Sequence, residues 1–108
     1  MSKRSAFFKL DLLILSSLQS MDRYGYDITQ FIKEHTDQTY DIKVGIMYPI
    51  LYKLNEEGYI SSYEKMFNGR PRIYYHLENK GIEYLNELID EFTLGTQIVE
   101  NFLALKGL

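Results

Sequence analysis

The sequence contains no cysteine and no tryptophan, and proline occurs only twice in its 108 residues. Without cysteine the chain forms no disulfide, no thiolate zinc site and no cysteine nucleophile. Long hydrophobic runs are also missing: the longest aliphatic run covers residues 12–15, too short to span a bilayer, and no small-residue cleavage site follows it. We therefore expect a cytoplasmic protein without a membrane partner.

The residues that could carry catalysis are few and scattered. The two histidines, His35 and His76, fall in a polar turn and in a predicted strand, and their separation does not fit metal ligation. The carboxylate pairs, Glu56-Glu57 and Asp90-Glu91, join neighbouring residues that point to different faces of a helix, so we interpret them as solvated surface. The sequence thus predicts a protein that is not an enzyme, with no catalytic residue, no metal and no cofactor.

Basic charge is scarce overall, with 12 Lys/Arg against 15 Asp/Glu and a net charge of −3. As an average, this balance argues against a nucleic-acid partner. The charge is unevenly distributed, however: residues 1–76 carry ten Lys/Arg and nine Asp/Glu, whereas residues 77–108 carry two and six. Residues 42–76 hold five Lys/Arg against three Glu. The acidity therefore belongs to the C-terminal third, and the middle of the chain is mildly basic.

Two helices are predicted in the first third of the chain. Residues 5–20 carry apolar side chains on two stripes, so this helix should be covered on both sides. A turn at residues 22–25 leads to a second helix, which ends before His35.

A third helix is predicted over residues 43–57, and Gly58 suits the left-handed position that follows a helix. Its inward residues are Val44, Met47, Leu51 and Leu54. Isoleucine, proline and tyrosine fall on the outward face, which suits a helix lying in the major groove of DNA. The alternative is that Ile46 and Ile50 pack on a neighbouring element. The outward residues are Gly45, Ile46, Pro49, Tyr52, Lys53 and Glu56, with Lys43 and Tyr48 at the flanks.

A β-hairpin follows the third helix. Asn68-Gly69 separates two runs, residues 60–65 and 72–77, that are rich in tyrosine, isoleucine and serine, and this dipeptide is the strongest short-range hairpin signal. Arg70 and Arg72 at the tip could reach phosphates or a minor groove, although two exposed arginines at a turn also occur by chance. The residues predicted to contact DNA are Lys43, Ile46, Tyr48, Pro49, Tyr52, Lys53, Arg70 and Arg72.

From Asn79 a helical period runs almost to the end of the chain, long enough for a helix of ~40 Å. Its apolar stripe is longer than so small a domain can cover, which predicts a homodimer. The expected fold is mainly α with a small two-stranded β-hairpin. It combines a winged helix-turn-helix DNA-binding domain at residues 1–78 with a long C-terminal dimerisation helix at residues 79–108.

Three motifs together resemble the PadR-like transcriptional regulators: GYDI at residues 25–28, GIMYPILYKLNEEGYI at residues 45–60 and GRPRIYYHL at residues 69–77. The likeness covers nearly the whole chain and is similar to the short, multidrug-binding branch of that family. It implies a homodimeric repressor of double-stranded operator DNA, released by a small aromatic or cationic effector at the dimer interface. Phe92 stands where an aromatic side chain of that branch stacks on the ligand.

Two sets of residues follow from this resemblance and from the apolar stripes. The expected ligand-binding residues are Phe7, Leu10, Asp11, Ile89, Phe92 and Thr96. The expected dimer-interface residues are Phe8, Leu12, Leu15, Leu88, Val99, Phe102 and Leu103. Asp11 has two interpretations, a partner for a cationic ligand or a carboxylate that favours a helix start and stays open to water.

Two other functions are consistent with the sequence. The net acidity and the sparse polar groups on the outward face of the third helix also suit a winged-helix protein-interaction adaptor that does not read DNA. A repressor without any small-molecule inducer, with its interface packed shut, is the other alternative.

Overall fold

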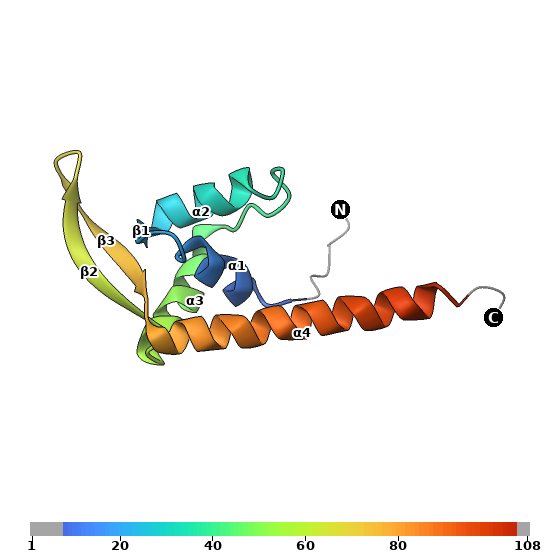
Figure 1. The fold of residues 1–108 in the computed structure, drawn as a ribbon. Coiled ribbons are helices and arrows are strands. Elements are labelled where there is room, and N and C mark those ends of the chain that lie inside the picture. The colour runs from blue at the N-terminus through green and yellow to red at the C-terminus, as the bar shows by residue number, and fades with distance from the viewer. Residues whose placement is uncertain (1–7, 106–108) are drawn as a thin grey trace.

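The computed structural model of the chain describes residues 8–105, in which four helices and three strands follow one another with short connections (Figure 1). Within that range the elements are α1 (Leu10–Ser17), β1 (Arg23–Tyr24), α2 (Gly25–Glu34), α3 (Val44–Glu56), β2 (Ile60–Phe67), β3 (Arg70–Leu77) and α4 (Asn79–Leu103). This order confirms a winged helix-turn-helix with a long C-terminal helix.

The core lies among α1, α2, α3 and the first half of α4, and the base of the hairpin closes it. Helical spacing places Ile28 and Ile32 of α2 inward, together with Met47, Leu51 and Leu54 of α3. These α3 residues confirm the predicted inward face. Val44 was also predicted to face inward, but its side chain is exposed at the first position of α3. Ile42, just before the helix, is buried instead.

The first helix is shorter than predicted. Instead of residues 5–20, α1 covers Leu10–Ser17, while residues 5–7 lie outside the described part of the chain. At its C-terminus, Arg23 Nε donates a hydrogen bond of 2.6 Å to the carbonyl oxygen of Ser17, which satisfies one of the carbonyl groups that the helix end leaves free.

The sheet has three strands, not two, which corrects the predicted turn at residues 22–25. Arg23 and Tyr24 form β1 and pair with Tyr75 and Tyr74 of β3, so the strand order is β1-β3-β2. Arg23 holds this segment extended, since its buried guanidinium lies 3.9 Å from the centre of the Phe31 ring besides bonding to α1. A two-residue strand leaves almost no alternation in the sequence, so pattern alone gives no signal for it.

The hairpin itself is as predicted. Asn68 and Gly69 both have positive φ, 52° and 77°, as a two-residue primed turn requires. The strands pair without interruption from Ile60↔Leu77 to Phe67↔Arg70 and extend as a wing from the helical body (Figure 1). Gly58, with φ of +82°, turns the chain from α3 toward β2, also as predicted.

The α4 helix starts inside the body and then projects from it (Figure 1). Gly81, Leu85 and Leu88 are buried in its first half, whereas Leu94, Ile98 and Phe102 are exposed in its second half. No helix within residues 8–105 is both long and apolar enough to cross a membrane.

At Gly81, α4 packs closely against the rest of the chain, because a Cβ at this position would collide with the carbonyl oxygen of Tyr59. We expect Gly81→Ala to lower the free energy of unfolding by at least about 2 kcal/mol, since backbone must move to admit the methyl group. Urea unfolding at a fixed protein concentration measures this change.

Gly45→Ala is the matched control, because Gly45 also lies in the first turn of a helix but has no described atom within 4 Å of its Cβ position. It is expected to leave stability unchanged or to raise it by up to about 1 kcal/mol. Equal losses in the two variants would show that helix propensity, not the contact with Tyr59, accounts for the effect.

Candidate nucleic-acid interface

The outward face of α3 is exposed and largely apolar. Ile46, Tyr48 and Tyr52 are 53%, 45% and 68% exposed, which is unusual for side chains of this size. The alternative that Ile46 and Ile50 both pack on a neighbouring element holds only for Ile50, which lies half-buried against the core. Pro49 and Lys53 are exposed on the same helix. The structure therefore brings the predicted α3 residues together on one open surface.

Tyr48 lies directly over the start of α2. A Cβ at Gly25 would collide with the Tyr48 hydroxyl group, so the glycine makes room for the ring. Beside this contact lies a groove of about 230 Å³ between α3 and β3, and Tyr26, Arg72 and Ile73 contribute to its walls. The groove joins the exposed face of α3 to the wing.

The two wing arginines are not equivalent, although both were predicted at the tip. Arg70 is the first residue after the turn and is exposed. Arg72 is half-buried, with its guanidinium carbon 4.8 Å from the centre of the Tyr24 ring. Its Nε is buried and has no hydrogen-bond partner among residues 8–105. Arg70 is therefore free to reach outward, whereas Arg72 is fixed at the edge of the groove.

Lys43, predicted to contact DNA, precedes α3 and its side chain is largely exposed. Its Nζ donates a hydrogen bond of 3.0 Å to Asp41 Oδ2, and this bond lowers the pKa of Asp41. The ion pair is exposed, so it restrains the lysine only weakly.

Asp22 connects the segment before β1 to both long strands of the wing, and sequence reasoning missed this cluster. Its carboxylate accepts hydrogen bonds from the Tyr63 hydroxyl group at 2.6 Å and from His76 Nδ1 at 2.8 Å. Burial acts to raise the pKa of Asp22, but the bonds from Tyr63 and His76 hold it below its ordinary value. The same contact raises the pKa of His76 above 6.5. No local pattern could reveal residues 41 and 54 positions apart.

The predicted ligand-binding residues fall into two groups. Asp11 accepts a hydrogen bond from the Tyr84 hydroxyl group at 3.2 Å, near the start of α4. Phe92 lies two helical turns further along and packs edge-on against Phe8, with ring centres 5.6 Å apart. Leu10 and Thr96 are half-buried and Ile89 is exposed, while Phe7 lies outside the described residues. The structure does not bring Asp11 and Phe92 together.

The predicted dimer-interface residues also divide. Leu15 and Leu88 are 0% and 6% exposed in the core of a single chain. Neither side chain offers surface to a partner, so the prediction that they lie in a dimer interface is wrong. The apolar stripe of α4 continues past the body as Val99 and Leu103, with Phe102 beside it, and all three side chains are exposed. Phe8 and Leu12 are half-buried.

Comparison with known proteins supports the arrangement of helices and wing. The model of the Transcriptional regulator PadR-like family matches residues 14–87. A relative named Uncharacterized protein X, from Lysinibacillus sphaericus, is 33% identical over 95 residues, which are 87% of each chain. The Negative transcriptional regulator PadR of Bacillus subtilis is 40% identical over 52 residues, which are 48% of this chain and 29% of that protein.

Solved structures share the fold. A transcriptional regulator from Clostridium thermocellum is 34% identical with a TM-score of 0.80, over 86% of this chain and 91% of the other. The Bacillus subtilis PadR, solved in complex with operator DNA, is 28% identical with a TM-score of 0.67, over 84% of this chain and 58% of the other.

The Asp22–His76 contact predicts a pH-dependent contribution to stability. Because the folded-state pKa of His76 is raised, the contribution is complete below about pH 6.5 and is lost as the pH rises through that pKa. Because the pKa of Asp22 is lowered, this contribution to stability stays intact until the pH falls below about 4. We expect His76→Gln to be destabilised by about 0.5 kcal/mol at about pH 5.5 and by less at about pH 8.5, because both side chains are partly exposed.

Urea unfolding at the two pH values measures this difference, with His35→Gln as the control. The His35 ring contacts the Phe31 carbonyl oxygen, not a carboxylate. The same pH dependence in both variants would rule out a specific contribution from Asp22.

Proposed function

We propose that this chain, which belongs to the PadR-like family of transcriptional regulators, binds double-stranded operator DNA as a homodimeric repressor. Membership in a family of regulators confirms the prediction that the protein is not an enzyme. In this proposal residues 1–78 bind DNA and residues 79–108 join two copies.

The observation that carries the proposal is the exposed face of α3 beside the wing. Ile46 and Tyr52 present apolar surface of the kind that contacts thymine methyl groups, and Lys53 supplies a cation for phosphates. Arg70 extends the same surface along the wing. The Bacillus subtilis PadR, which shares the fold, was solved in complex with operator DNA, and this supports the same use of the surface here.

Homodimerisation is supported by the projecting half of α4. Val99 and Leu103 continue the core-facing stripe, and Leu94, Ile98 and Phe102 lie beside it, so apolar groups cover more than one side of the helix. A single chain leaves this surface in water, whereas a second copy buries it. Two α3 helices would then enter successive major grooves about one helical turn apart.

We also propose a small aromatic or cationic effector at the dimer interface. Phe92 is 37% exposed and rests on Phe8, which in turn packs against Tyr40 at a ring-centre distance of 5.7 Å. Exposed Ile89 and half-buried Thr96 lie one turn away on either side. A ligand bound there would change the spacing of the subunits and so release the operator.

The exposed apolar face of α3 and the acidic net charge also suit a protein-interaction adaptor. Gel-shift titration against the protein's own upstream DNA separates the two functions, because an adaptor forms no salt-dependent specific complex. Addition of planar cations in the same assay tests the effector, and an unchanged complex would favour a repressor without an inducer.

Arg70→Ala is expected to weaken binding to all DNA sequences several-fold and to reduce the slope of log K against log salt by about one, because one phosphate contact is lost. Adding Arg72→Ala should reduce the slope further. Lys33→Ala is the control, since Lys33 lies in the last turn of α2, pairs with Asp41 at 3.8 Å and is outside the predicted DNA-contacting set. An unchanged salt slope in the double variant would exclude the wing from DNA binding.

Phe102→Glu is expected to convert a dimer of twice 12.8 kDa into a 12.8 kDa monomer at micromolar concentration, because the charge enters the apolar surface. Light scattering measures the mass. Gln97→Glu places the same side chain on the polar side of α4 and should remain dimeric. A wild-type mass of 12.8 kDa would contradict the homodimer directly.

A further inference from the structure

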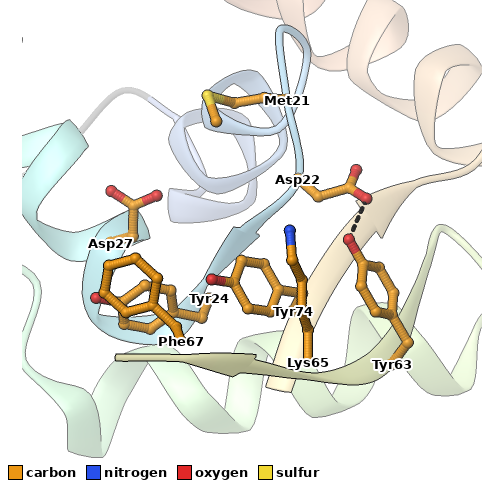
Figure 2. A pocket seen from close by; sticks show the side chains of 8 residues that line it. All are labelled: Met21, Asp22, Tyr24, Asp27, Tyr63, Lys65, Phe67 and Tyr74. Carbon is orange, nitrogen blue, oxygen red and sulfur yellow. Dashed lines mark hydrogen bonds between the residues drawn. The ribbon is translucent and has the colours of Figure 1, made fainter. Parts of the chain in front are cut away.

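A second hollow, of about 530 Å³, lies along the outer part of the wing, between the segment before α2 and the strands (Figure 2). Because side chains alternate along a strand, Tyr63, Lys65 and Phe67 of β2 face this hollow while Met66 faces the other way. Ile73 of β3, which lines the groove beside α3, faces away from this hollow, and the Tyr24 ring borders both. The lining residues are Met21, Asp22, Tyr24, Asp27, Tyr63, Lys65, Phe67 and Tyr74.

Aromatic rings supply half of the lining residues. The Tyr24 ring lies 5.8 Å from that of Phe67 and 5.5 Å from that of Tyr74, and Tyr63 stacks on Tyr74 at 5.8 Å. Figure 2 shows these rings along the lower side of the hollow, with Met21, Asp22 and Asp27 on the opposite side. Ring faces carry negative electrostatic potential, so a wall of this kind attracts cations.

A cation of the chain itself already occupies part of the space. Lys65 Nζ lies 5.2 Å from the centre of the Tyr74 ring, and its positive charge contributes to the lowered pKa of Asp22. Lysine is held on a flexible stem, so this side chain can leave the hollow at little cost. Asp27 is paired with Arg23 at 3.3 Å, and Asp22 accepts hydrogen bonds from Tyr63 and His76, so the two carboxylates of the lining supply negative charge to the hollow while keeping their own partners.

We propose that this hollow binds a small organic cation, an alkylated ammonium group carried on an apolar body, in place of the Lys65 side chain. The ring of Tyr74 would hold the ammonium group where Lys65 Nζ now lies, and the charge of Asp22 would attract it from a longer distance. Met21 and Phe67 would contact the apolar body. The volume suits a ligand of drug-like size.

This site is independent of the proposed function. The interface effector is proposed for the middle of α4, around Phe92, and α4 extends away from the wing (Figure 1). The hollow is formed by one chain, and none of its residues belongs to the predicted DNA-contacting set. Its occupancy can therefore be tested without DNA, and a failure there leaves the repressor proposal unchanged.

The methionines provide a direct assay. Met21 lines the hollow and Met66 lies on the opposite face of β2, and the two are similarly exposed, at 57% and 61%. We expect the ¹³C-methyl resonance of Met21 to shift saturably during titration with benzyltrimethylammonium, with a Kd in the millimolar range or below, while that of Met66 stays in place. Benzyl alcohol is the neutral control and should bind at least fivefold more weakly.

Three variants sharpen the test. Phe67→Leu removes one ring from an exposed position and should weaken binding at least threefold, whereas Met66→Leu, its neighbour on the other face, should not. Lys65→Gln removes the internal cation and should tighten binding severalfold. Equal affinity for benzyl alcohol, equal shifts at Met21 and Met66, or weaker binding by Lys65→Gln would each overturn the proposal.

Discussion

The carbonyl group of Tyr59 is the point at which α3, the wing and α4 are joined. Its oxygen accepts a hydrogen bond from the Glu78 backbone N–H at 3.0 Å, and Gly81 packs directly against it. Lys80 Nζ adds a bond of 2.7 Å to the carbonyl oxygen of Glu57, just after α3. These two hydrogen bonds and the close packing of Gly81 attach the start of α4 to the end of α3 and to the base of the wing. The direction of α4 therefore depends on the end of α3 and the base of the wing.

Sequence reasoning succeeded where local chemistry determines local structure. Asn68-Gly69 predicted the hairpin because both residues accept positive φ, and Gly58 predicted the end of α3 for the same reason. The spacing of Met47, Leu51 and Leu54 predicted which face of α3 is buried, and hence which face is open. The α3 part of the candidate interface is therefore predictable from the pattern of apolar residues along the helix.

Sequence reasoning failed where a contact joins distant residues. The strand β1 is held by Arg23, which bonds to the end of α1 and lies on the Phe31 ring. Two residues are too few to show the alternation of side chains that marks a strand in a sequence. The Asp22 cluster, the position of Arg72 over Tyr24 and the separation of Asp11 from Phe92 all depend on how elements pack. The prediction of Leu15 and Leu88 as interface residues was wrong because a periodic stripe does not show where the core of one chain stops covering it.

The joint at Tyr59 also determines how the proposed dimer would act on DNA. If the outer half of α4 sets the distance between two subunits, a rigid connection to α3 converts a small change in that distance into a change of half-site spacing. The charges follow the proposed division between the DNA-binding surface and α4. Glu87, Asp90, Glu91 and Glu100 are exposed on α4, whereas α3 and the wing expose Lys53, Lys65 and Arg70 together with Glu56 and Glu64. Most of the net charge of −3 thus lies on the helix proposed to join two subunits, while the surface proposed to read DNA is mildly basic.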